Sequence, residues 1–146
     1  MSGLDLVIRG GTVIDGTGAE GYQADVGLVG GKIAEIGRIA PGGARVIDAE
    51  GHIVTPGFID GHTHMDAQMH WDHLGANSCW HGVTSVVMGN CGFSIAPIRK
   101  GQQALVARSL ERAEDISGAA MEAGIDFCWE SYADYLDVVD ALPKEI

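Results

Sequence analysis

Two histidines and one cysteine form the pattern in this chain that could do the most chemistry. His62 and His64 stand two residues apart at the end of the run Gly-Phe-Ile-Asp-Gly-His-Thr-His, and Cys91 follows in Gly-Asn-Cys-Gly at residues 89–92. In a β-strand, side chains at positions i and i+2 point to the same face. Two neutral imidazoles and a nearby thiolate are ligands that zinc prefers. The pattern therefore predicts a divalent metal site, with zinc as the expected ion.

Each of these residues taken alone has a structural interpretation. A cysteine beside a buried strand is most often a small packing residue, and a histidine is often held by ordinary hydrogen bonds. The metal interpretation becomes the stronger one only when the three residues are considered together. Asp66, two residues after His64, is expected either to orient a ligand histidine or to cap a helix, and both roles remain open.

The other histidines and cysteines are expected to be structural. Three of the histidines fall near two tryptophans, which favours surface or packing roles, and one more lies in the glycine-rich first third of the chain. Two cysteines are expected to be packed thiols. These residues are His70, His73 and His81, then His52, and finally Cys79 and Cys128.

Two apolar segments must position the three candidate ligands. Residues 58–60 and the β-branched run at 83–88 are predicted to be strands, the second covered on both faces as in a parallel sheet. Residues 66–80 are predicted to form a helix, or a helix with a loop, that Gly82 terminates. Parallel strands lie about 4.8 Å apart, and reactive groups gather at their carboxyl ends. Cys91 is therefore expected to reach the histidine pair.

The last third of the chain is predicted to be helical. An apolar stripe begins at Leu105, with charged residues mostly on the opposite face. Ser131 with Asp134 three residues later predicts the start of a second helix, which Pro143 ends. Strands alternating with helices favour βαβ units.

Glycine pairs separate the predicted strands in the first third of the chain. The sequence predicts three strand pairs, with hairpins at Gly10–Gly11 and Gly30–Gly31 and a turn at residues 49–51. The expected strands are 4–9 with 12–15, 24–29 with 32–36, and 45–48 with 52–55. Residues 1–56 are therefore predicted to be a small antiparallel β layer.

Composition sets further limits. The chain has 146 residues, 46% of them hydrophobic, and a net charge of −11, which argues against nucleic acid as a partner. It has no apolar run of 18 or more residues, and Met1 to Arg9 lacks the pattern of a secretory signal, so neither a leader nor membrane association is expected. Three scattered cysteines fit a reducing cytoplasm better than a disulfide framework.

The run from Val54 to His64 resembles the first-strand signature of the amidohydrolase superfamily. The preceding β layer, with Gly-Gly-Thr-Val-Ile-Asp-Gly at residues 10–16, is similar to the opening β-sandwich segment of that family. Gly-Asn-Cys-Gly resembles the branch that contains D-aminoacylase and other N-acyl-D-amino-acid deacylases, in which a cysteine replaces a carboxylated lysine. The resemblance implies that His62 and His64 bind one, often weakly held, metal. It implies that Cys91 bridges to a second, tighter zinc.

The resemblance also implies an α/β fold in two parts. Residues 1–56 would be the N-terminal part of a small β-sandwich. Residues 57–146 would be the first two βα units of a TIM-type (β/α)₈ barrel plus a helical segment. Such a barrel needs about 250 residues, so we expect it to be incomplete here. The chain would be an N-terminal fragment, or a subunit completed as an oligomer by a second polypeptide.

The expected function is zinc-dependent hydrolysis of the amide bond of N-acyl-D-amino acids. The enzyme would be active only when the rest of the barrel is present. The resemblance places the general base outside this chain, and no substrate-binding residue is assigned within it. Two alternatives remain open: a cyclic amide or imide hydrolase of the same superfamily, and a non-catalytic scaffold remnant.

Overall fold

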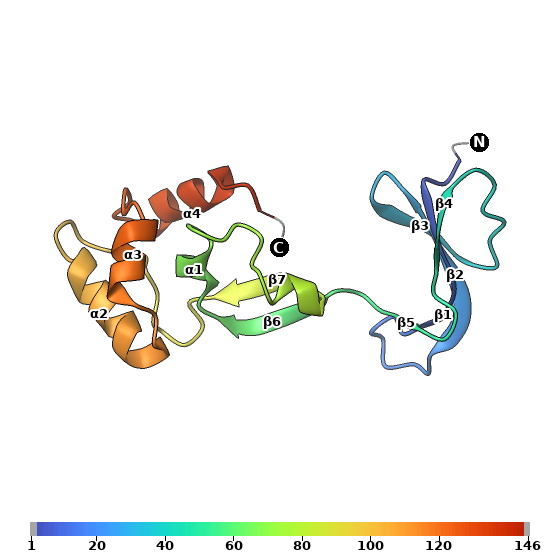
Figure 1. Ribbon diagram of the computed structural model, residues 1–146, viewed down its shortest axis with the longest axis horizontal. Helices are drawn as coiled ribbons and strands as arrows, with labels where there is room; N and C mark the ends of the chain where they lie inside the picture. The colour runs from blue at the N-terminus through green and yellow to red at the C-terminus, as the bar shows by residue number, and fades with distance from the viewer. Residues whose placement is uncertain (1–2, 145–146) are drawn as a thin grey trace. The chain divides into compact units, whose positions relative to one another are not determined.

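The computed structural model describes residues 3–144, and the chain divides after Pro56 into two compact units (Figure 1). The N-terminal unit covers residues 1–56 and the C-terminal unit covers residues 57–146. Among the described residues, no helix has the length and apolar character needed to span a bilayer.

The N-terminal unit is built on one five-stranded sheet in the order β3-β2-β1-β4, with β5 also paired to β1. Its strands are β1 (Leu6–Val13), β2 (Tyr22–Val29), β3 (Lys32–Gly37), β4 (Arg45–Asp48) and β5 (Ile53–Val54). The hairpin predicted at Gly30–Gly31 is confirmed, because both glycines have positive φ and join the antiparallel strands β2 and β3.

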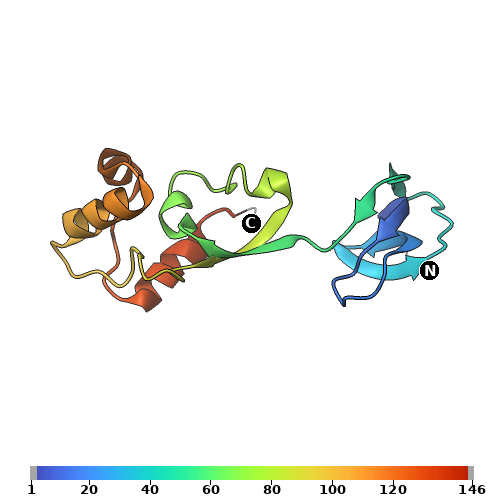
Figure 2. The ribbon, with the colours of Figure 1, turned by 90° about the horizontal axis from the view of Figure 1, so that it is seen from below.

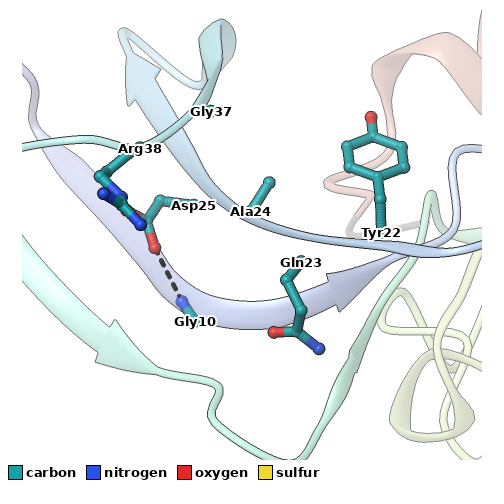
Figure 3. A pocket seen from close by; sticks show the side chains of 7 residues that line it. All are labelled: Gly10, Tyr22, Gln23, Ala24, Asp25, Gly37 and Arg38. Atoms are coloured by element: carbon teal, nitrogen blue, oxygen red, sulfur yellow. Dashed lines mark hydrogen bonds between the residues drawn. The ribbon is translucent and has the colours of Figure 1, made fainter.

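The hairpin predicted at Gly10–Gly11 is wrong. Strand β1 runs straight through both glycines, and its register against β2 shifts between Ile8 and Gly11. Gly10 has a φ of +73°, and its N–H donates to Asp25 Oδ1 at 2.8 Å (Figure 3). The other carboxylate oxygen of Asp25 accepts from the N–H of Ile39 at 2.9 Å. Asp25 therefore stabilises a bulge at the position where a turn was expected.

The prediction of an antiparallel layer is also wrong in part, because β4 and β5 do not pair with each other. Both run parallel to β1, one beside each half of that strand. The chain between them stays hydrogen-bonded to β1: the Ala49 N–H donates to the Arg9 carbonyl, and the Thr12 N–H donates to the His52 carbonyl. Residues 49–51 therefore do not reverse the chain. They carry it past the bulge of β1, so that β5 continues in the same direction as β4.

The C-terminal unit begins with a parallel strand pair, as predicted. Strand β6 (Phe58–Thr63) pairs with β7 (Val83–Met88). A four-residue helix, α1 (Met65–Gln68), and a 3₁₀ helix, η1 (Cys79–His81), lie between them in sequence. Gly82 ends η1 with a φ of +86°, which is the terminating position expected for it.

Three further helices contribute to the core of this unit together with the segments that connect them. They are α2 (Gln103–Glu114), α3 (Gly118–Gly124) and α4 (Tyr132–Ala141). The predicted start of α4 is confirmed, since Ser131 and Asp134 form a reciprocal capping box. Helix α3 was not predicted, because its glycines and alanines carry little apolar pattern. The core residues come from α1, these helices, the loop after β7 and the segment between α3 and α4: Ala67, Ile95, Ala96, Ile98, Ala107, Leu110, Met121, Ile125, Trp129, Tyr135 and Val139.

The strand pair is more exposed than a parallel strand covered on both faces. Ile59 on β6 is 73% exposed, and Phe58 and Val87 are also exposed. The described residues therefore do not cover both faces of the pair, and the barrel stays a prediction. The carboxyl ends of β6 and β7 point toward α2 and α3 within this unit (Figures 1 and 2).

Candidate metal centre

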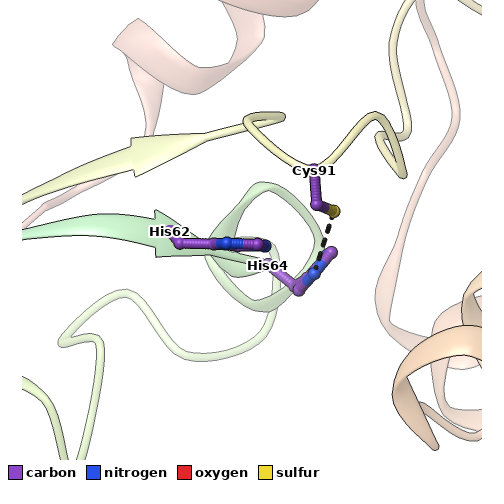
Figure 4. A group of neighbouring side chains, drawn as sticks. All are labelled: His62, His64 and Cys91. Atoms are coloured by element: carbon purple, nitrogen blue, oxygen red, sulfur yellow. Dashed lines mark hydrogen bonds between the residues drawn. The ribbon is translucent and has the colours of Figure 1, made fainter.

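The carboxyl ends of β6 and β7 bring the three predicted ligands together (Figure 4). His62 is the second-last residue of β6, and His64 directly follows that strand. Cys91 lies in the turn after β7. One ligand atom from each residue lies within 4.8 Å of the others. Cys91 is distant in sequence from the two histidines, and the parallel pairing of β6 with β7 brings it beside them.

Cys91 and His64 form the closest contact of this group. Cys91 Sγ lies 3.3 Å from His64 Nε2, and the rings of His62 and His64 are 6.0 Å apart between centroids. Zinc bonds of about 2.0–2.3 Å in a tetrahedron place neighbouring donor atoms about 3.4–3.6 Å apart. The contact between sulfur and nitrogen is close to that spacing, and His62 needs a modest movement to join it. The metal-binding role of the three residues stays a prediction.

The turn that carries Cys91 is held to β6 by an asparagine. Asn90 Nδ2 donates to the Gly61 carbonyl at 2.8 Å, which ties the two strand ends together beside the histidines. Gly89 and Gly92 flank the turn with φ of +74° and +85°, conformations that favour glycine. The Gly-Asn-Cys-Gly sequence therefore contributes both the thiol and the turn that presents it.

Asp66 does not cap α1. His64 occupies the N-cap position of that helix, and Asp66 is only 1% exposed. Its Oδ2 accepts from the N–H of Ile95 at 3.0 Å, and its Oδ1 is buried without a hydrogen-bond partner among the described residues. Asp66 therefore fixes the segment that follows Cys91, and among the described residues its carboxylate makes no hydrogen bond to His62 or His64.

Two aromatic residues complete this arrangement, which we call the Ile95 clamp (Asp66, Ile95, Trp129 and Tyr135). Trp129 Nε1 donates to the Ile95 carbonyl at 2.9 Å, and the Tyr135 hydroxyl donates to the Asp66 carbonyl at 3.2 Å. Burial raises the pKa of Tyr135 above its usual range, so the hydroxyl keeps its proton and remains a donor. The clamp joins α1, the loop after β7 and α4.

The remaining histidines and cysteines have mostly structural surroundings. His70 stacks on Trp129 with ring centroids 5.0 Å apart, which confirms a packing role. Burial lowers the pKa of His70, which favours its neutral form. Cys79 is half-buried, but Cys128 is exposed, so the prediction of a packed thiol is wrong there. Two other histidine rings contact backbone oxygens: His73 Nδ1 lies 2.6 Å from the Met69 carbonyl and His52 Nδ1 lies 3.0 Å from the Glu50 carbonyl.

Glu114 was not anticipated as a neighbour of the site. It is the last residue of α2, and its Oε1 lies 3.2 Å from His64 Nε2. The sequence placed Glu114 on the polar face of an amphipathic helix, and no local pattern shows which charged residue of that face turns toward the strands.

An open pocket lies beside the histidines. It has a volume of 330 Å³ and is lined by polar and apolar side chains, among them Asp60, Gln68, Trp71 and Ile116. Its volume falls at the lower end of the range typical of small-molecule sites, which is about 300–1,000 Å³. The pocket offers room for a small molecule next to His62 and His64.

Comparisons with known proteins place this geometry in context. Residues 45–144 match the model of a family described as the amidohydrolase family. D-aminoacylase from Alcaligenes xylosoxydans xylosoxydans is 36% identical over 144 residues, which are 98% of this chain and 28% of that protein.

Two solved structures are also similar. A structure of D-aminoacylase described for its binuclear metal centre has a TM-score of 0.75 at 37% identity and covers 98% of this chain and 28% of its own. N-acyl-D-glutamate deacylase from Bordetella bronchiseptica, complexed with zinc and a phosphonate inhibitor that mimics the tetrahedral intermediate, has a TM-score of 0.75 at 34% identity. It covers 99% of this chain and 28% of its own. The chain thus spans little more than a quarter of the length of these relatives.

Proposed function

The chain belongs to the amidohydrolase family, and from that premise we propose that it supplies part of the metal site of a hydrolase that cleaves N-acyl-D-amino acids. The observation that carries the proposal is the meeting of His62, His64 and Cys91 at the carboxyl ends of two parallel strands. The relatives named above are hydrolases of N-acylated D-amino acids, which supports this substrate class.

The donor set fits zinc. Two imidazole nitrogens and a thiolate are soft or borderline ligands, whereas magnesium and calcium prefer sites made of oxygen atoms. His62, His64 and Cys91 would hold the ion. When bound, zinc polarises an amide carbonyl and lowers the pKa of water toward neutrality. Cys91 would also be available to a second zinc, whose other ligands would have to come from strands outside the described residues.

The chain's own residues have positioning roles in this proposal. Asn90 holds the Cys91 turn against β6, and the Ile95 clamp fixes the segment that follows it. The pocket beside the histidines would admit the acyl amino acid, with Trp71 and Ile116 as apolar walls. The proton-transfer residue would come from another barrel strand, supplied by the polypeptide that completes the barrel.

The test is to purify the chain under native conditions, identify what co-purifies, and assay the assembly and the isolated chain. We expect turnover of N-acetyl-D-amino acids, little turnover of the L enantiomers, and none by the isolated 146-residue chain. Turnover by the isolated chain would contradict the proposed division of labour.

The same assay separates the alternatives. Faster hydrolysis of hydantoin-like rings than of N-acetyl-D-amino acids would favour the cyclic amide hydrolase. Metal analysis addresses the scaffold alternative: less than about 0.2 zinc per chain in the native assembly, far below the content of a tight site, would favour a non-catalytic role.

A further inference from the structure

Glu114 occupies an unusual place for a carboxylate. It ends helix α2, and the next residue, Asp115, turns the chain away with a φ of +55°. The C-terminus of a helix carries partial negative charge, so an acidic side chain there is unfavourable unless a positive group lies close by. Asp115 adds a second formal negative charge at the same end. Arg112 supplies one positive charge in the same turn, which leaves the helix end with a net negative charge that favours a further cation near Glu114.

The Glu114 side chain is directed at the candidate metal centre. Its Oε1 lies 3.2 Å from His64 Nε2, and the side chain is only 33% exposed. Glu111, one turn earlier on the same helix, instead accepts a hydrogen bond from the Gly118 N–H at 3.2 Å. The two acidic residues of α2 thus have different surroundings, and of the two only Glu114 contacts a residue of the centre.

We propose that Glu114 is a fourth metal donor beside His62, His64 and Cys91, which rests on the metal site of the proposed function. His64 Nε2 lies 3.3 Å from Cys91 Sγ and 3.2 Å from Glu114 Oε1. Both distances are near the spacing of about 3.4–3.6 Å between neighbouring donors around a tetrahedral zinc. The nitrogen of His64 is therefore already flanked by two potential donors at suitable distances. Glu114 is not in the group of side chains whose ligand atoms lie within 4.8 Å of one another, so its carboxylate has to move toward His62 and Cys91 when the ion binds.

The charges of this donor set also balance. One thiolate and one carboxylate offset the double positive charge of zinc, which suits a half-buried site where an uncompensated ion is costly. Four protein donors make a closed coordination shell of the kind found in structural sites, whereas catalytic sites keep one position open. With Glu114 as a donor, the isolated chain would hold its metal through four protein side chains.

Cobalt titration of the full chain after chelator treatment tests this inference. Cobalt reports a thiolate ligand through a charge-transfer band and four-coordinate geometry through intense d–d bands. We expect both bands in the wild-type chain. Loss of a residue that supports a metal ligand weakens affinity by about 10- to 100-fold, so Glu114→Gln should weaken cobalt binding at least about tenfold and reduce the d–d intensity.

Two further variants separate direct ligation from an electrostatic effect. Glu122→Gln on α3 makes the same change of charge at an exposed position and should bind cobalt as the wild type does. Glu114→His removes the charge but supplies a nitrogen donor, so it should restore part of the affinity that Glu114→Gln loses. Wild-type affinity and spectrum in Glu114→Gln would overturn the inference, and so would failure of Glu114→His to bind better than Glu114→Gln.

Cys91→Ser distinguishes failure of this inference from failure of the proposed metal site. If Cys91→Ser loses the charge-transfer band while Glu114→Gln behaves as the wild type, only the role of Glu114 is refuted. If the wild-type chain binds no cobalt, the four-donor site is refuted, and the three-donor site of the proposed function then depends on strands from elsewhere. Far-UV circular dichroism should be the same for all variants, because each altered side chain lies outside the buried core.

Discussion

Replacing Asp66 with alanine should destabilise the C-terminal unit and loosen the segment after Cys91. Asp66 Oδ2 accepts the hydrogen bond of the buried Ile95 N–H, and truncation leaves that N–H without this partner. An unsatisfied buried donor costs about 1–3 kcal/mol. For a unit of this size that loss corresponds to a fall in Tm of roughly 4–24 °C. Thermal unfolding followed by tryptophan fluorescence measures the change, because Trp129 is 2% exposed whereas Trp71 and Trp80 are already exposed in the folded chain.

Asp66→Asn provides the conservative comparison. The asparagine side chain keeps a carbonyl oxygen that can accept from Ile95, so the loss should be less than half that of alanine. Asp126→Ala is a matched control at an exposed position and should unfold within about 0.5 kcal/mol of the wild type. The reasoning is refuted if Asp66→Ala unfolds at the wild-type temperature, or if alanine and asparagine destabilise equally.

Two predictions concern the N-terminal unit, and each has its own measurement. Gly11→Ala places a Cβ 2.5 Å from Val54 Cγ2, so overpacking should cost about 1–3 kcal/mol in urea unfolding; a cost below 0.5 kcal/mol would contradict the close approach of β5 to β1. The pKa of Asp25 is lowered, first by the N–H of Ile39 and then by that of Gly10. Its stabilising contribution is therefore complete above the ordinary pKa of 3.8 and is lost as the pH falls through the lower folded-state pKa. Asp25→Asn should reduce the loss of Tm between neutral pH and pH 3, and an unchanged pH profile would contradict this role.

The two Gly-Gly pairs show how far local sequence could predict the fold. Gly30–Gly31 forms the expected hairpin, whereas Gly10–Gly11 lies inside a strand. The difference comes from Asp25, whose carboxylate holds the Gly10 N–H across the sheet. That partner is distant in sequence, so no property of the dipeptide itself could reveal it. Strand β7, by contrast, was predicted at its observed bounds because its β-branched run needs no distant partner to be recognised.

In the candidate site, too, some residues could be predicted from local sequence and others could not. The convergence of His62, His64 and Cys91 followed from spacing and from the parallel pairing of two predicted strands. Glu114 and the role of Asp66 could not be predicted, because each depends on how a helix or loop packs against the strands. Such packing is set by many long-range contacts in the core, and a single sequence does not display them.

The Ile95 clamp has a consequence for the order in which the protein is made. Its anchors Trp129 and Tyr135 follow Cys91 in the sequence, so the segment after Cys91 should lack these contacts until α4 has emerged and docked, and only Asn90 should hold the Cys91 turn before then. Metal capture should therefore follow synthesis of that helix. Chains that stop before Trp129 should bind cobalt more weakly than chains that include α4, and equal affinity would show that the thiol is positioned without these late anchors.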